Sequence, residues 1–111
     1  LVIPTNWPVG SDSWAHTPKV RALENHFHVV VSDRVGEERG FGFCGHSQIV
    51  DFMGKVYGEA GETEETIIYG DLDLAAADQN RVVRVPGTWE FDRIASRRPE
   101  MYAPITAPRS G

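Results

Sequence analysis

The chain has 111 residues, which is room for one small domain and excludes a multidomain protein. Eleven Lys and Arg against sixteen Asp and Glu give a net charge of −5, so the basic surface that binds nucleic-acid phosphates is not expected. With 41% hydrophobic and 24% charged residues, the composition is typical of a folded domain and argues against a disordered chain.

Cysteine content and hydropathy indicate where the protein works. Cys44 is the only cysteine, so no internal disulfide can form and nothing points to an oxidising compartment. The longest apolar run, residues 27–31, contains His28 and is far shorter than the roughly 20 residues that cross a bilayer. We expect a cytoplasmic protein with neither nucleic acid nor membrane as a partner. Because no initiator Met or leader pattern opens the chain, we also expect a piece of a longer protein.

The first residues predict a strand. Residues 1–3, Leu-Val-Ile, precede Pro4, Thr5 and Asn6, a pattern typical of a short, fully buried strand that stops at a turn. A buried strand has neighbours on both sides, so we expect some of its partners to lie upstream of Leu1.

A helix is predicted next, from Trp14 to Asn25. Its N-cap is one of the three polar residues at positions 11–13, Ser-Asp-Ser. Pro18 either kinks this helix or lies in a restarted first turn that Thr17 caps.

Two contrasting segments follow the helix. Residues 27–31 are rich in valine and predict a central strand, which the polar residues 32–34 end. Residues 36–45 hold four glycines and the charged cluster Glu-Glu-Arg, a composition that predicts an exposed loop.

The second half of the chain predicts a meander. A strand over residues 45–52, with Ser47, Ile49 and Asp51 on one face, turns at Met53 and Gly54 into a second strand at residues 55–57. The remaining predictions are an acidic surface loop at 59–65, a third strand at 66–72, a helix over 74–80 capped by Asp71 or Asp73, and an irregular basic segment beyond Arg81.

Three groups of side chains could carry chemistry. Cys44 and His46 can share a strand face as a thiolate and its base with Asp51 nearby, but a lone cysteine is more often a small buried hydrophobe. His26, His28, Cys44 and His46 could converge on a metal, but their spacing fits no zinc signature and core histidines are commoner. We therefore expect no metal. The arginines at 81, 84, 93, 97 and 98 favour ion pairs with another subunit.

Five short motifs stand in order along the chain. They are Pro-Thr-Asn-Trp-Pro at 4–8, Arg-Ala-Leu-Glu-Asn at 21–25, Asp-Arg-Val-Gly at 33–36, Gly-His-Ser-Gln-Ile-Val-Asp-Phe-Met-Gly at 45–54 and Arg-Arg-Pro-Glu-Met-Tyr at 97–102. Together they resemble the C-terminal part of a carbon-nitrogen hydrolase of the nitrilase superfamily. Asp33 departs from the family pattern, which has Asn there, and so does Phe52, which replaces a proline.

The resemblance implies an α/β (α+β) fold, the C-terminal portion of an α-β-β-α sandwich, over residues 1–104 with a tail at 105–111. It implies cleavage of a small-molecule amide, carbamoyl group or nitrile by a cysteine nucleophile, with a glutamate base and a lysine that stabilises the oxyanion. These three residues should lie upstream of Leu1, and Cys44 does not match the nucleophile. The chain alone is therefore expected to be inactive, and no cofactor is expected.

The motifs also suggest site residues. Thr5, Asn6 and Trp7 are predicted to form one lip of the substrate pocket, with a plain turn and a core-packed Trp7 as the alternative. Structural roles are predicted for Arg21, Glu24 and Asn25, which should tie the helix to neighbouring loops; for Ser47 and Asp51, which should hold the hairpin and the Arg34 loop; and for Gly45 and Gly54 at the hairpin ends.

Two other functions stay open at this point. A non-catalytic half-domain could work as an association module that buries the sheet edge at Leu1. Such an edge and the arginine-rich end both favour a homo-oligomer. A metal-binding or Cys44-dependent protein is the third possibility.

Overall fold

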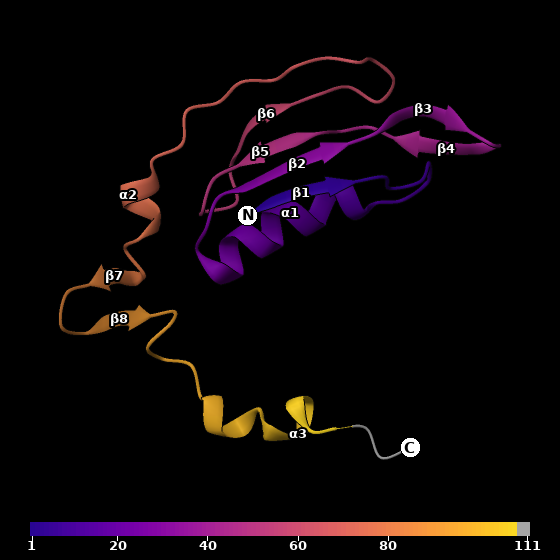
Figure 1. Cartoon of the computed structure of the whole chain (residues 1–111). Helices are drawn as coiled ribbons and strands as arrows, with labels where there is room; N and C mark the ends of the chain where they lie inside the picture. Colours follow the sequence, from indigo (N-terminus) through magenta and orange to yellow (C-terminus); the bar gives the residue numbers. More distant parts are fainter. Residues whose placement is uncertain (109–111) are drawn as a thin grey trace. The chain divides into compact units, whose positions relative to one another are not determined.

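The computed structural model describes residues 1–108, which divide into a first unit, residues 1–79, and a second that begins at Asn80. In the first unit the helix α1 (Ser13–Asn25) covers one face of a four-stranded sheet (Figure 1). The strands are β1 (Val2–Thr5), β2 (Val29–Asp33), β5 (Gln48–Val50) and β6 (Val56–Glu59), in the order β1-β2-β5-β6. β1 runs parallel to β2, and the other neighbouring pairs are antiparallel.

The core of this unit lies between β2 and α1. Val29 and Val31 lie two residues apart, so their side chains share the face of β2 that the helix covers. They are 0% and 2% exposed and are buried together with Ala22 of α1 and Val50 of β5. The predicted central strand is confirmed, although it begins at Val29 and extends to Asp33. Its valines suit a pleated surface that is covered on the helix side.

β1 lies at the edge of the sheet. It pairs with β2 alone within residues 1–108, and Val2 keeps 69% of its surface exposed. The prediction of a fully buried strand relied on partners upstream of Leu1, so it stays a prediction. Apolar composition does not distinguish an edge strand from a central one, whereas Pro4, which cannot donate to a ladder, is a residue that edge strands tolerate.

α1 is one continuous helix that contains the buried Pro18, so the predicted restart at Thr17 is wrong. Asp12 occupies the N-cap position without a side-chain bond, while the Ser11 hydroxyl accepts the N–H of Ser13 at 3.2 Å. His26 ends the helix in the left-handed conformation, with φ 55°.

The predicted loop at 36–45 is instead a hairpin of β3 (Val35–Glu38) and β4 (Phe41–Cys44). Its turn residues, Arg39 and Gly40, have φ of 53° and 82°, the two positive values of a type I′ turn. Arginine is uncommon at such a position, and the glycines of this stretch suggested a loop more strongly than a pair of strands.

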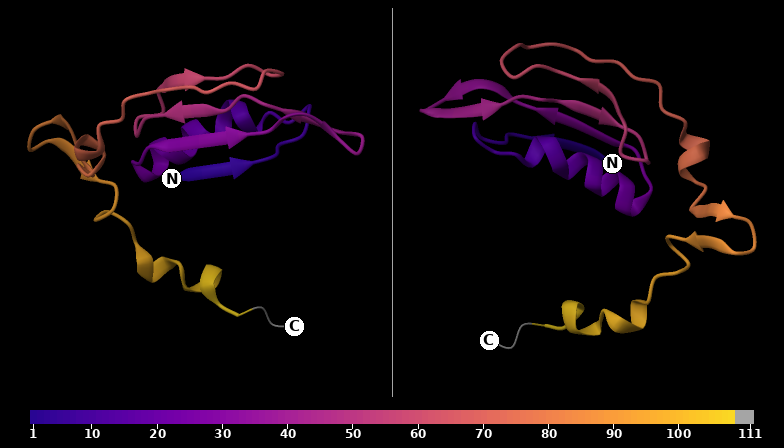
Figure 2. Two further views of the ribbon diagram at one scale, coloured as in Figure 1. Left: turned by 45° about the horizontal axis from the view of Figure 1, so that its top comes forward. Right: turned by 180° about the vertical axis from the view of Figure 1, so that it is seen from behind.

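The β5–β6 hairpin is confirmed, with a turn in which the Gly54 N–H donates to the Asp51 carbonyl at 2.9 Å. The predicted third strand at 66–72 is wrong, because this segment forms no ladder. It passes beside β6 (Figure 2), and a Cβ at Gly58 would lie 3.4 Å from the Tyr69 carbonyl oxygen. A segment that packs close to a strand without hydrogen bonding to it has the same alternation of apolar residues as a strand, so the sequence does not distinguish the two.

Helix α2 (Leu74–Ala77) ends three residues earlier than predicted. Asp73 caps it, because its carboxylate accepts the N–H of Ala76 at 3.0 Å. This contact decides between the two predicted caps.

The second unit is regular where an irregular segment was predicted, so that prediction is wrong. It contains a hairpin and two short helices, β7 (Arg81–Val85), β8 (Trp89–Asp92), η1 (Pro99–Met101) and α3 (Ala103–Thr106). Arg81 pairs with Glu90 across the hairpin at 2.5 Å, and Arg98 pairs with Glu100. The last three residues of the predicted tail at 105–111 lie outside the described residues. None of the helices within residues 1–108 has the length and hydropathy of a membrane-spanning segment.

Candidate functional site

The carboxyl ends of the parallel strands β1 and β2 mark the candidate site. Thr5 lies opposite Asp33 in the ladder, so the residues that follow both strands lie at one edge of the sheet. In α/β sheets, ligands bind outside the carboxyl ends of parallel strands. We call Thr5, Asn6 and Trp7 the lip. Asn6 is exposed, and the other two are half-buried.

The lip is held from two sides. The N–H of Trp7 donates to the Asp33 carboxylate at 3.0 Å, and the carbonyl of Trp7 accepts the N–H of Cys44 at 3.0 Å. Val9 continues this contact by donating to the Gly42 carbonyl at 2.9 Å. The turn after β1 is thereby added to the β3–β4 hairpin, and Trp7 also packs against the core cluster.

Asp33 receives several of the bonds at this edge. Its Oδ1 also accepts the N–H of Arg34 at 2.8 Å, and its Oδ2 lies 3.4 Å from the sulfur of Cys44. Asp33 was noted in the sequence only as a departure from a motif and was not assigned to the site. A polar residue at the end of a buried parallel strand is the signal that could have found it.

Cys44 is 4% exposed, and its thiol donates to Asp33. Burial, followed by the hydrogen bond to Asp33 and the negative charge of Asp33, raises the pKa of Cys44 to about 11. A thiol with this pKa stays protonated at neutral pH, whereas a cysteine nucleophile acts as the thiolate. The arrangement opposes a nucleophilic role for Cys44.

His46 does not act as the partner of Cys44. Its ring stacks on Trp14 of α1 with centroids 3.7 Å apart, and its Nδ1 lies 3.3 Å from the Glu59 carboxylate. Asp51, the third member of the predicted group, accepts the N–H groups of Met53 and Lys55, each at 2.8 Å. The structure does not bring the three together as a catalytic group.

The histidines of the metal alternative have other contacts as well. His28 Nε2 lies 2.9 Å from the Asp73 carbonyl, so this nitrogen carries the proton, and the rings of His26 and His28 both meet the ring of Phe52 edge to face. Within residues 1–108, no group of three or more His, Cys, Asp or Glu side chains is placed to hold a metal ion.

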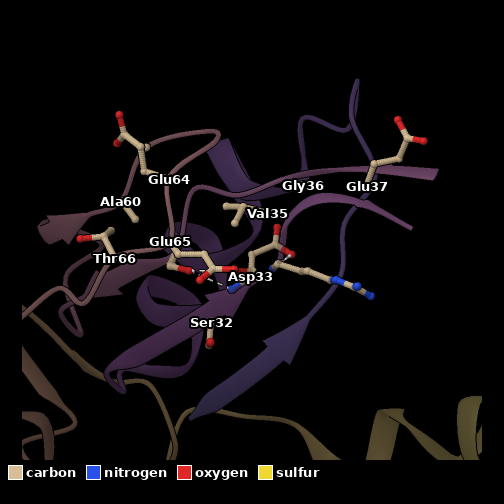
Figure 3. A pocket seen from close by; sticks show the side chains of 12 residues that line it. Ser32, Asp33, Val35, Gly36, Glu37, Ala60, Glu64, Glu65 and Thr66 are labelled. Atoms are coloured by element: carbon tan, nitrogen blue, oxygen red, sulfur yellow. Dashed lines mark hydrogen bonds between the residues drawn. The ribbon is translucent and has the colours of Figure 1, made fainter. Parts of the chain in front are cut away.

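A cavity of about 530 Å³ opens beside Asp33 (Figure 3). Ser47 lines it, and its hydroxyl accepts the N–H of Asp33 at 2.9 Å while lying 3.3 Å from the Asp33 carbonyl. Glu64 and Glu37 point outward from it (Figure 3). The carboxylates outnumber the one lining arginine, which favours neutral or cationic ligands over anions. The full lining is Ser32, Asp33, Arg34, Val35, Gly36, Glu37, Ser47, Ala60, Gly61, Glu64, Glu65 and Thr66.

A second hollow, of about 490 Å³, lies on the Asn6 side of the lip. Phe41, Phe43 and Pro8 line it together with the polar Glu38 and Arg39. The lip thus contributes to a largely apolar hollow through Asn6, while Asp33, which holds the lip, lines the polar cavity.

The three predicted structural residues of α1 bond within the helix. Arg21 pairs with Glu24 at 3.3 Å, and the Asn25 amide donates to the carbonyl of Arg21 at 3.0 Å. Both interactions join residues of the helix itself, and the expected tie from α1 to a neighbouring loop stays a prediction. Both charged side chains are more than half exposed, since their partner lies one turn away on the outer helix surface.

The remaining predicted positions lie in or next to the β3–β4 and β5–β6 hairpins. Arg34 pairs with Glu38, and its guanidinium lies 4.6 Å from the centre of the Phe43 ring. A Cβ at Gly45, where φ is 64°, would lie 2.6 Å from the Glu62 carbonyl oxygen, so no larger residue fits there. Gly54 also has a positive φ, 81°, in the turn of the second hairpin.

Comparison with known proteins identifies relatives for most of the chain. The family model described as carbon-nitrogen hydrolase matches residues 4–82. A probable nitrilase of Schizosaccharomyces pombe is 34% identical over 109 residues, 97% of this chain and 38% of the relative. A 2-oxoglutaramate amidase of Bacillus subtilis is 34% identical over 82 residues, 73% of this chain and 31% of that protein.

A solved structure agrees with the sequence relatives. Nit3 of Saccharomyces cerevisiae, a member of the nitrilase superfamily, superposes with a TM-score of 0.59 at 28% identity, covering 69% of this chain and 30% of its own. The predicted α/β class and the resemblance to the nitrilase superfamily are confirmed. The chain spans between 30% and 38% of the length of these proteins.

Proposed function

Because the chain belongs to the carbon-nitrogen hydrolase family, we propose that it forms the C-terminal part of an enzyme that hydrolyses a non-peptide carbon-nitrogen bond. The observation that carries this proposal is the family match over residues 4–82, which includes the lip, Asp33 and the β3–β4 and β5–β6 hairpins. The proposed substrate is a small amide, carbamoyl compound or nitrile. Relatives named as a nitrilase and an amidase support this class.

The proposed reaction needs groups other than those of this chain. We propose that the cysteine nucleophile, glutamate base and lysine lie in a part of the protein that precedes Leu1. The raised pKa of Cys44 and the separate contacts of His46 support this division of roles, because this pair supplies neither a thiolate nor a base that activates one. The chain by itself should not hydrolyse amides.

The chain's own contribution to the site is the lip. Asn6 is exposed, and its side-chain amide has both donors and an acceptor, which suits the carbonyl and amino groups of an amide substrate. Thr5 and Trp7, half-buried on either side, are proposed to complete this wall of the substrate pocket. The residue range 1–104 remains our proposal for the extent of the family domain.

Ammonia release tests the proposal. The 111-residue chain and the complete open reading frame from which it comes are each incubated with butyramide, a carbamoyl compound and a nitrile. The complete protein should release ammonia from at least one of them, and the 111-residue chain from none. Hydrolysis by the 111-residue chain that is lost in Cys44→Ser would contradict the proposed division of roles.

The exposed edge of β1 favours a second function, association. Val2 is exposed on a strand that pairs on one side alone within residues 1–108, and such edges pair readily with another strand. We propose that the protein works in the cytoplasm as a homo-oligomer. Light scattering during size-exclusion chromatography should give the mass of a multimer, and a monomer at all concentrations would contradict this second function.

A further inference from the structure

The main chain of the lip depends on one carboxylate. We propose that Asp33 is a positioning residue, whose carboxylate sets the backbone conformation of Trp7 and through it the placement of Asn6 and Thr5. The inference rests on the proposed function, because the lip is the proposed substrate wall. Asp33 acts through the lip and is not assigned a contact with the substrate.

A closed ring of hydrogen bonds carries this inference. The N–H of Trp7 donates to Asp33 Oδ1 at 3.0 Å, the thiol of Cys44 donates to Asp33 Oδ2 across 3.4 Å, and the N–H of Cys44 donates to the Trp7 carbonyl at 3.0 Å. Three segments far apart in the sequence meet in this ring. Removing the carboxylate opens two of its three sides.

The backbone of Asp33 is held in place by contacts that do not involve the lip. It is the last residue of β2, paired with Thr5 of β1, and its N–H donates to the Ser47 hydroxyl at 2.9 Å. A carboxylate on a rigid strand loses little entropy when it binds, so its bonds hold a neighbouring turn effectively. The turn that it holds has no regular ladder to the sheet beyond Thr5.

Substitution of Asp33 by asparagine and substitution by alanine should have different effects on the lip. Asparagine keeps an Oδ1 that accepts the N–H groups of Trp7 and Arg34, and it exchanges only the oxygen near Cys44 for an amino group. Alanine removes every acceptor. A positioning role therefore predicts that Asp33→Asn retains the lip and that Asp33→Ala releases it.

Amide hydrogen exchange, measured by NMR on the 111-residue chain, tests this prediction. Asp33→Ala should accelerate exchange at the Trp7 N–H by roughly tenfold or more, because an N–H bonded to a charged acceptor becomes free. Asp33→Asn should stay within about threefold of the parent chain. The N–H of Val30, bonded to the Leu1 carbonyl at 2.9 Å, reports on the stability of the sheet, and its exchange should accelerate less than that of Trp7.

Two results for Asp33→Ala would overturn the inference. One is unchanged exchange at Trp7 in Asp33→Ala. The other is equal acceleration at Trp7 and Val30, which would show that Asp33 contributes to general stability instead of to the lip. Cys44→Ala, which opens one side of the ring, should accelerate Trp7 exchange less than Asp33→Ala does; an equal or larger effect would also overturn the role of the carboxylate.

A second measurement separates this inference from the proposed function. Ammonia release by the complete protein from butyramide is compared between parent, Asp33→Asn and Asp33→Ala. Positioning predicts a raised KM in Asp33→Ala that Asp33→Asn largely restores, and an unchanged KM would overturn it. If the parent hydrolyses no amide, carbamoyl compound or nitrile, the proposed function fails, while the exchange at Trp7 still decides whether Asp33 holds the turn.

Discussion

Two turns of the first unit are held by an aspartate in the same way, yet they differ in where the donors come from. The Asp51 carboxylate accepts the N–H groups of Met53 and Lys55, two and four residues along the chain. The Asp33 carboxylate accepts the N–H of Trp7, which is 26 residues away, and the thiol of Cys44. The first is a local turn that forms from its own sequence, while the second requires that β1, β2 and β4 are already assembled.

The largest effect is expected for Asp33→Ala. It leaves the N–H groups of Trp7 and Arg34 and the buried thiol of Cys44 without their acceptor. We expect the free energy of unfolding of the first unit to fall by about 2–3 kcal/mol, because bonds to a charged acceptor are worth about 1.5–3 kcal/mol each and water replaces some of them. Urea denaturation followed by circular dichroism measures this. If the free energy of unfolding falls no more in Asp33→Ala than in Asp51→Ala, the long-range bonds of Asp33 contribute no more to stability than the local bonds of Asp51.

The turn held by Asp33 should make the free energy of unfolding depend on pH through Cys44, whereas the turn held by Asp51 has no such group. The pKa of Cys44 is about 11 in the folded chain and ordinarily 9.0, so between these values the folded state binds the proton that the unfolded state has lost. Stability should therefore fall as pH rises from 9 to 11, by up to about 2 kcal/mol. Urea midpoints at pH 8 and pH 11 measure the fall, which Cys44→Ala should abolish; the same fall in that variant would contradict the assignment.

Asp51→Ala should have a smaller effect, a loss of about 1–2 kcal/mol. Met53 and Lys55 are exposed residues within four positions of Asp51, so a small local shift of the turn can bring the freed N–H groups to water. Urea denaturation measures the loss, with Asp51→Asn as the matched control because it keeps one acceptor oxygen. A loss above that of Asp33→Ala would show that the local turn, and not the long-range ring, contributes more to stability.

The smallest effect is expected at Arg21 on the outer face of α1. Its ion pair with Glu24 spans 3.3 Å between side chains that are 60% and 56% exposed. Such pairs contribute about 0–0.5 kcal/mol and weaken with salt, so Arg21→Ala should change the urea midpoint little. Arg21→Lys is the control that keeps the charge. A loss above about 1 kcal/mol would indicate a partner other than Glu24 for Arg21.

The same contrast between local and long-range contacts explains which predictions were right. The β5–β6 hairpin and the cap of α2 depend on neighbours in the sequence. Gly54 indicates the turn, and an aspartate shortly before Leu74 indicates the cap, although the structure was needed to choose Asp73 over Asp71. The β3–β4 hairpin was missed because Arg39 is an uncommon turn residue, and residues 66–72 were misread because they lie beside β6 without bonding to it. Whether an extended segment joins a ladder depends on what lies next to it.

Residue types alone indicate the family and the central strand β2, because five ordered motifs and a valine-rich run can be recognised before the fold is known. The folded structure shows that β1 pairs on one side alone within residues 1–108 and that Asp33 bonds to Trp7. It also decided that Cys44 is a protonated, buried thiol. Exposure, long-range hydrogen bonds and pKa values are set by neighbours that are distant in the sequence, and those neighbours are defined only when the chain has folded.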